Sequence, residues 1–154
     1  MMARIGKLNF QQLKDFETRL RSLDDRNAFA EACAKELAAR LLAKVIKRTP
    51  VGNYPKGSGK KGGTLRRGWT GEKRASASGY VDSLEITHAG NTYSIEIINP
   101  VEYASYVEYG HRTANHKGWV PGVFMMTISE QELQAVAPQI LERKIKKYME
   151  GLMK

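Results

Sequence analysis

The chain has one cysteine, three histidines and no long apolar run, and these absences exclude several classes of protein. Because Cys33 is the only cysteine among 154 residues, no intrachain disulfide can form, and a reducing compartment is favoured. No run of about 18 apolar residues exists, so we expect no membrane-spanning segment. Residues 1–9 lack the apolar stretch of a secretory signal. We therefore expect a protein that acts, or is assembled, in a cytoplasm.

Residues that commonly carry catalysis or bind metals are sparse and scattered. His111 and His116 follow Glu108, but their spacing matches no zinc motif. Residues 57–61 read Gly-Ser-Gly-Lys-Lys and superficially resemble a phosphate-binding loop, yet no Ser or Thr follows the lysines and a helix precedes them. Cys33 lies on an apolar stripe and is expected to be a small buried apolar residue. We expect no enzymatic activity, no metal and no cofactor.

Acidic residues are almost missing from one long stretch, which makes the charge uneven. The net charge is +9, and between residues 44 and 74 ten Lys and Arg residues are opposed only by Glu72. A second basic cluster closes the chain over residues 143–154. Such a surface attracts polyanions, above all DNA, through counterion release. The alternative is a solvated surface that keeps the protein soluble, and few aromatic residues are present for base stacking.

Two helices are predicted near the N-terminus from apolar spacing. Residues 10–23 carry an apolar residue every three or four positions, and Asn9 precedes them as an N-cap. A second, alanine-rich helix is expected from Asp24 or Asp25 to about Arg48, because Pro50 disfavours helical geometry just before it. Four of its residues align at i+4 spacing as an apolar stripe: Phe29, Cys33, Leu37 and Leu41.

A long C-terminal helix is predicted to begin with a capping box formed by Ser129 and Glu132. Its apolar stripe continues to Leu152, and Pro138 inside it predicts a kink or a restart. The apolar run 123–128 suits a strand or the start of this helix, and we interpret it as a strand.

The middle of the chain alternates between loops and short strand-like runs. Residues 51–63 are rich in glycine and lysine with almost nothing to bury, so a mobile surface loop is expected. Strands are expected at 65–70 and 80–87, and residues 82–98 are expected to form an antiparallel hairpin. Within that hairpin three side chains should share one face: Tyr93, Ile95 and Ile97.

A short helix over 101–109, ended by Gly110, and a second mobile loop over 111–121 complete the prediction. No repeat or linker divides the chain. We therefore expect one α+β domain over residues 1–154, in which N-terminal helices and a long C-terminal helix flank a small antiparallel sheet.

Tyrosines recur at three-residue steps on the short helix: Tyr103, Tyr106 and Tyr109. Such residues are common at the edge of a core, and the alternative is a protein interface, where tyrosine gives a large contact area. The same two interpretations apply to Trp69 and Trp119. Two other residues of the helix should face inward: Ala104 and Val107.

Two motifs follow one another along the chain. The first runs from Thr49-Pro50-Val51, across the 51–63 loop, to Gly63-Thr64-Leu65-Arg66. The second starts at Asn99 and continues as Tyr103-Ala104, Val107-Glu108 and Gly110. Their combination resembles the small head–tail joining proteins of long-tailed bacteriophages, which include tail completion and neck proteins. The first motif here has a longer insert and the order Gly63-Thr64 where the family has Thr-Gly.

The resemblance implies a non-enzymatic virion protein that joins capsid and tail. Such proteins work as rings through which DNA passes, so the expected partners are other connector or tail proteins and further copies of the chain. We expect a homo-oligomeric ring in the particle, a monomer in isolation, assembly in the bacterial host cytoplasm, non-specific contact with passing DNA, and no membrane. The alternative is a stand-alone basic DNA-binding module.

The candidate interface consists of aromatic and charged residues in and beside the two motifs. These are Tyr54, Arg66, Arg67, Trp69, Tyr103, Tyr106, Glu108, Tyr109 and Trp119.

Overall fold

The computed structural model describes residues 23–71, 75–90 and 92–153, and the helix predicted over 10–23 lies almost wholly outside them. The described part has five helices and two antiparallel sheets of two strands each, so the α+β class is confirmed. Two separate hairpins stand in place of one small sheet. The order is α2 (Leu23–Arg48), α3 (Thr64–Gly68), α4 (Ala77–Asp82), β1 (Ile86–Ala89), β2 (Thr92–Ile95), α5 (Ala104–Tyr109), β3 (Gly110–Arg112), β4 (Trp119–Pro121) and α6 (Met125–Met153).

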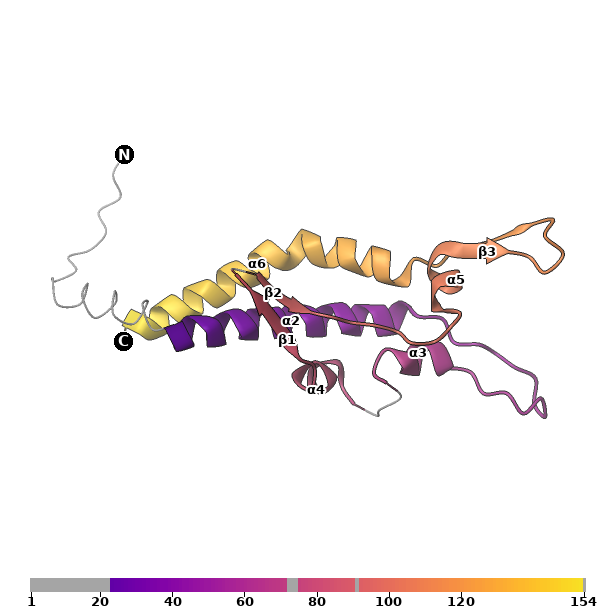
Figure 1. The fold of residues 1–154 in the computed structure, drawn as a ribbon, viewed down its shortest axis with the longest axis horizontal. Helices are drawn as coiled ribbons and strands as arrows, with labels where there is room; N and C mark the ends of the chain where they lie inside the picture. Colours follow the sequence, from indigo (N-terminus) through magenta and orange to yellow (C-terminus); the bar gives the residue numbers. More distant parts are fainter. Residues whose placement is uncertain (1–22, 72–74, 91, 154) are drawn as a thin grey trace.

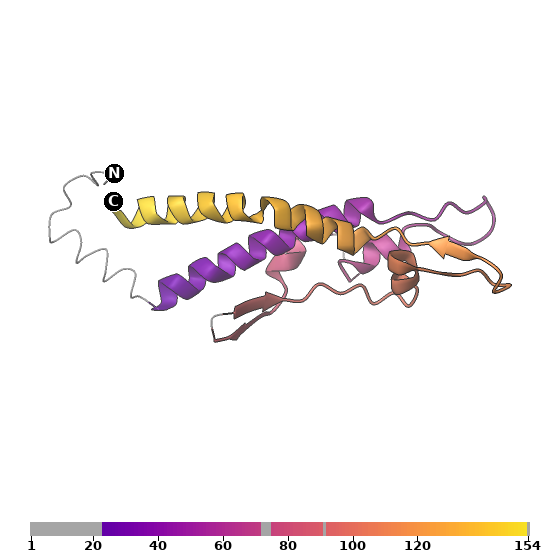
Figure 2. The same cartoon turned by 90° about the horizontal axis from the view of Figure 1, so that it is seen from above.

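The long helices α2 and α6 run antiparallel and side by side, and they set the long axis of the molecule (Figures 1 and 2). Ion pairs join them along this contact. Arg48 and Lys44 of α2 both reach Glu132, at 2.6 and 3.0 Å, and Lys144 reaches Glu36 at 2.8 Å. No helix among the described residues is long and apolar enough to cross a membrane.

Helix α2 ends at Arg48 as its sequence predicts, but it already includes Leu23, so neither Asp24 nor Asp25 begins it as a cap. Its fully buried residues are Leu42 and Val45, whereas Leu37 and Leu41 of the predicted stripe are only half-buried. The face of α2 that points into the core is therefore the row next to the predicted stripe. The buried cluster also takes residues from other elements: Ala38, Leu65, Trp69, Val81 and Met125.

Two predicted strands are helices instead. Residues 65–70 form the end of α3 and the turn after it, because Gly63 takes a left-handed φ of 94° at its N-cap. Leu65 and Trp69 are four residues apart and both buried, which is the spacing of one helical turn. Residues 80–82 belong to α4, whose N-cap Ser76 accepts a hydrogen bond from the Gly79 N–H.

The predicted hairpin is confirmed but shorter. Strand β1 pairs with β2 in a register that sets Ile86 opposite Ile95, and the strand prediction overshoots toward Pro100. Exposure alternates from Thr92 to Ile98, and the half-buried positions are Tyr93, Ile95 and Ile97, which agrees with the prediction that they share one face.

A second hairpin replaces the loop predicted over 111–121. Strand β3 pairs with β4, with His111 opposite Val120 and Arg112 opposite Trp119. Before it, α5 ends at Gly110 as predicted; this glycine has a φ of 89°, which suits a residue without a side chain. Ala104 and Val107 pack against the core from α5, as expected.

Helix α6 begins at Met125, so the run 123–128 is not a strand and the predicted capping box is wrong. Ser129 lies one turn inside the helix, where its hydroxyl donates to the Met125 carbonyl oxygen and accepts from Arg48. Glu132 is used for the ion pairs with α2. The helix continues through Pro138 without a break, and Figure 1 shows it bent part-way along its length.

Two extensions project beyond the same end of the helix pair (Figures 1 and 2). The first, here named the loop arm, is the irregular segment 51–63, in which residues 51–61 are all exposed. The second, named the hairpin arm, is the β3–β4 hairpin over residues 110–121.

Candidate functional site

The two halves of the first motif meet at Thr49, at the base of the loop arm. Trp69 donates its indole N–H to the Thr49 hydroxyl at 2.7 Å, and that hydroxyl donates to the Val45 carbonyl oxygen. The Arg66 guanidinium donates twice to the Thr49 carbonyl oxygen, at 2.7 and 3.2 Å. Thr49 has no exposed surface. The loop arm is therefore held at both ends by residues of the motif.

The second motif is joined to the first through Asn99. Its side-chain amide donates to the Leu65 carbonyl oxygen at 2.7 Å, and its side-chain oxygen accepts from the Val101 N–H at 3.2 Å. Gly68 lies so close to Asn99 that an added Cβ would overlap its side chain. The asparagine and the glycine thus bring α3 against the chain that leads into α5.

Glu108, at the end of α5, caps the N-terminus of α6. Its buried carboxylate accepts hydrogen bonds from the backbone N–H groups of Met126 and Thr127, at 2.9 and 2.8 Å. It also accepts from the Thr127 hydroxyl at 2.7 Å. These are N–H groups that the first helical turn cannot satisfy itself, and a negative charge there is favoured by the helix dipole.

Five aromatic residues lie exposed around α5, the hairpin arm and the start of α6. Their exposed fractions run from 40% for Phe124 to 64% for Tyr109. The ring of Tyr109 meets that of Phe124 edge-on, with centroids 6.5 Å apart, and Tyr106 lies 5.7 Å from the ring of His111. We name this set the aromatic surface: Tyr103, Tyr106, Tyr109, Trp119 and Phe124.

The predicted interface residues fall into three groups. Four of them belong to the aromatic surface: Tyr103, Tyr106, Tyr109 and Trp119. Tyr54 and Arg67 are exposed at the loop arm and its base, and Arg66 is half-buried against Thr49.

Trp69 and Glu108 are buried, and their contacts are internal to the chain. Phe124 was not in the predicted set, because its apolar run favours a buried element. Its φ of 52°, rare for a residue with a side chain, turns it outward and has no local sequence signal.

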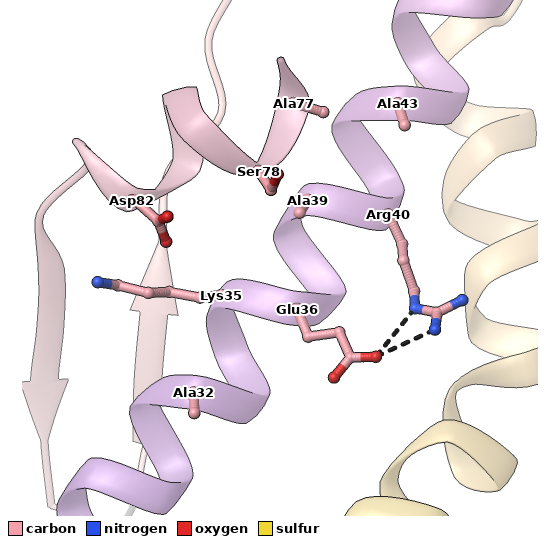
Figure 3. A pocket seen from close by; sticks show the side chains of 9 residues that line it. All are labelled: Ala32, Lys35, Glu36, Ala39, Arg40, Ala43, Ala77, Ser78 and Asp82. Carbon is pink, nitrogen blue, oxygen red and sulfur yellow. Dashed lines mark hydrogen bonds and ion pairs between the residues drawn. The ribbon is translucent and has the colours of Figure 1, made fainter. Parts of the chain in front are cut away.

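A groove between α2 and α4 does not gather catalytic groups (Figure 3). It has a volume of about 630 Å³, and its walls carry alanine methyl groups from both helices. Glu36 and Arg40 at its rim are bonded to each other at 3.0 Å, while Lys35 and Asp82 stand on its opposite walls. Within the described ranges, no group of three or more His, Cys, Asp or Glu residues could hold a metal ion.

Cys33 is half-buried in α2. Burial raises the pKa of its thiol above the ordinary value, and the positive charge of Lys144 offsets this only in part. The thiol therefore stays protonated near neutral pH, as the apolar interpretation expects.

A known protein family matches most of this architecture. The model described as "Bacteriophage HK97-gp10, putative tail-component" matches residues 14–110. The match spans more than half of the chain and includes α2 to α5 and both motifs. The chain belongs to the HK97 gp10-like family, which is described as a bacteriophage tail component, and this bears out the resemblance seen in the sequence. No curated protein and no solved structure matches the chain.

Proposed function

We propose that this chain is a tail completion or neck protein, a non-enzymatic ring subunit at the head–tail junction that is needed to join capsid and tail. The observation that carries the proposal is the aromatic surface on a member of a phage tail-component family. Residues 1–154 act in it as one domain, which assembles in the host cytoplasm and ends in the virion of a phage or prophage.

The aromatic surface supports a role in assembly because of its composition and its position. Tyrosine and tryptophan are enriched where proteins bind one another, and contiguous exposed apolar surface on a small protein marks an interaction site. The elements that carry these residues, α5, the hairpin arm and the start of α6, lie at the end of the helix pair from which both arms project (Figure 1). The groove between α2 and α4 brings no catalytic groups together, and the described residues include no cluster that could hold a metal ion.

The arms suit a protein that acts by docking. The loop arm presents exposed side chains in a segment without helix or strand, while its base is held by Thr49, Arg66 and Trp69. Such a segment can order against a partner without disturbing the core. The expected partners are other connector or tail proteins and further copies of the chain.

Deletion of the gene from a producing phage tests the proposal. We expect full heads and finished tails that fail to join, or particles that lose DNA, when lysates are viewed by electron microscopy. Complementation with a Tyr106→Ala/Trp119→Ala variant should fail, whereas Gln139→Ala, an exposed change on α6, should restore joining. Normal infectious particles from the deletion, with no copy of the protein in virions, would overturn the proposal.

A second candidate, a stand-alone DNA-binding module, is favoured by one observation. The loop arm exposes Lys56, Lys60 and Lys61 with no acidic residue in the segment. If this is the function, the isolated monomer should bind duplex DNA tightly, and the affinity should fall steeply with salt. Fluorescence anisotropy with unrelated duplexes at two salt concentrations separates the two functions, because the joining role predicts only weak binding.

A further inference from the structure

Charge is segregated along the part of the chain that lies outside the helix pair. Residues 49–71 and 109–129, which include both arms, contain no Asp or Glu, and residues 75–108 contain no Lys or Arg. The first set holds Lys56, Lys60, Lys61, Arg66, Arg67, Arg112 and Lys117, and the second holds Asp82, Glu85, Glu96, Glu102 and Glu108. Each region has no opposite charge of its own to balance it.

Among the described residues none of these charges forms an ion pair, although Arg66 and Glu108 are hydrogen-bonded within the chain. Every ion pair among the described residues lies within α2 or between α2 and α6. Glu85 and Glu96 flank the paired residues Ile86 and Ile95 at one end of the first hairpin, so two exposed carboxylates stand near each other there. Like charges placed side by side on neighbouring strands are unfavourable unless a positive group lies between them.

The basic arms cannot reach this hairpin in the same molecule. The arms extend beyond one end of the helix pair, whereas the β1–β2 hairpin lies along the other half of α2 (Figures 1 and 2). A contact between the two therefore has to join different copies, and because it uses two different surfaces, it is heterologous.

We propose that the loop arm of one copy docks on the outer face of the β1–β2 hairpin of the next copy. This inference rests on the proposed assembly function and names the contact that links neighbouring subunits. Lys60 and Lys61 lie against Glu85 and Glu96 of the neighbour.

The two surfaces also match in apolar character. The loop arm exposes Tyr54, over whose ring the Lys60 ammonium stands 5.8 Å from the centroid. The hairpin's outer face continues to Ile98, which is 57% exposed two residues after Glu96. An aromatic ring beside lysines thus faces an aliphatic side chain beside carboxylates. Asp82, the last residue of α4, lies on the wall of the alanine-lined groove in Figure 3, where Lys35 stands opposite it.

Zero-length carbodiimide cross-linking of the full chain tests the contact directly. Equal amounts of ¹⁴N- and ¹⁵N-labelled protein are mixed at high concentration and low salt, cross-linked and digested. We expect mixed-label peptides that join Lys60 or Lys61 to Glu85 or Glu96. These cross-links should disappear at high salt, because exposed charge pairs are screened within about 10 Å at 0.1 M ionic strength. Absence of such mixed-label peptides at low salt overturns the proposal.

Charge reversal supplies the second test, with self-association measured by sedimentation velocity at low salt. Lys60→Glu/Lys61→Glu should lower the association constant by about tenfold or more, because like charges then face each other. Glu85→Lys/Glu96→Lys should do the same, and the chain with all four changes should recover association. Lys146→Glu/Lys147→Glu, on the exposed side of α6, is the control for the loop variant. It changes the net charge by the same amount as Lys60→Glu/Lys61→Glu and should leave association unaltered.

Two results would contradict this contact specifically. If the quadruple variant does not recover association, or if the control weakens association equally, the pairing of these two surfaces does not govern assembly. If the loop variant loses DNA binding while its copy–copy cross-links persist elsewhere, the loop arm serves DNA. Either result leaves the head–tail joining role intact, because that role is judged by the deletion phenotype.

Discussion

The Glu108 carboxylate accepts hydrogen bonds from both the backbone N–H and the hydroxyl of Thr127, at 2.8 and 2.7 Å. A residue of α5 therefore caps α6. Glu108 is the glutamate of the second motif. Its contacts within the chain give it a structural role, so its presence in the motif needs no partner protein to explain it. Tyr103 of the same motif is exposed instead, as are Tyr106 and Tyr109, which lie between and beside the motif positions.

Removing this cap should destabilise the fold. Glu108→Ala leaves two N–H groups and a hydroxyl without their acceptor, and we expect the free energy of unfolding to fall by about 1–3 kcal/mol. Urea denaturation followed by circular dichroism measures the change. Glu102→Ala, an exposed residue two turns earlier in the chain, is the matched control and should change stability little. Equal stability of the two variants would show that Glu108 does not act as a cap.

The bond between Trp69 and Thr49 predicts a coupled pair. Thr49→Val leaves a buried indole N–H without an acceptor and should cost about 1–3 kcal/mol. Trp69→Phe removes the donor, so the double variant should cost less than the two single changes together. A double-mutant cycle from chemical denaturation gives the interaction energy. Simple additivity of the two changes would mean that the bond contributes nothing to stability.

The core of α2 can be located by truncation. Leu42 is fully buried, whereas Leu37 is half-buried on the edge of a groove. Leu42→Ala should therefore lower the free energy of unfolding by about 2–5 kcal/mol, and Leu37→Ala by clearly less. Thermal or urea melts of both variants measure the difference. A larger loss for Leu37→Ala would show that the apolar stripe read from i+4 spacing, and not the Leu42 row, faces the core.

Acid should weaken the contact between α2 and α6. Hydrogen bonds from Arg48 and then Lys44 hold the pKa of Glu132 below its ordinary value of 4.5. Because the folded-state pKa is the lower one, its contribution to stability is present above pH 4.5 and is lost as the pH falls through the folded-state pKa. The difference in Tm between wild type and Glu132→Gln should thus be present at pH 7 and vanish at strongly acidic pH. Glu130→Gln serves as the control, and a difference for Glu132→Gln that stays constant with pH would refute this assignment.

Limited proteolysis should begin in the loop arm. Lys56, Lys60 and Lys61 lie in an exposed segment without helix or strand, and a protease needs such extended, accessible chain. Brief digestion with trypsin followed by mass spectrometry should find the first cuts there. The lysines and arginines of α2 should be cut later, because the helix must open first. Equally early cuts within 26–48 would contradict the expectation.

The long helices could be predicted from sequence because their signals are local and repeated. Residues 25–48 show apolar spacing over several turns, and Pro50 marks the end. The short elements could not. Leu65 and Trp69 offer one helical interval, too little to separate α3 from a strand, and the left-handed Gly63 that begins the helix has no unique sequence pattern.

The hairpin arm was missed because its signal depends on pairing between distant residues. Strands of three residues are too short to show an alternation of apolar and polar residues. The antiparallel pairing that sets His111 opposite Val120 forms only after the chain has reversed direction, so it leaves no local signal in the sequence. The same holds for the start of α6. Ser129 and Glu132 have the local spacing of a capping box, but Glu108 supplies the cap from another helix.

The candidate site was predictable in its composition and not in its geometry. Three-residue spacing of the tyrosines left both a core edge and an interface open, and the structure leaves Tyr106 and Tyr109 exposed. Nothing local distinguishes Trp119, which is exposed, from Trp69, which is buried against Thr49. Trp69 is buried because the segment that follows α3 packs against the end of α2, whereas the hairpin arm that carries Trp119 does not.

The close approach of Gly110 and Gly122 has a mechanical consequence. An added Cβ at Gly122 would overlap the Glu108 carbonyl oxygen, so the root of the hairpin arm is pressed against α5. There the Val123 N–H donates to the Val107 carbonyl oxygen at 2.8 Å, and the Phe124 N–H donates to the Glu108 carbonyl oxygen at 3.0 Å. These bonds fasten the segment between the hairpin arm and the 29-residue α6 to α5, so the hairpin arm cannot tilt about its root without breaking them.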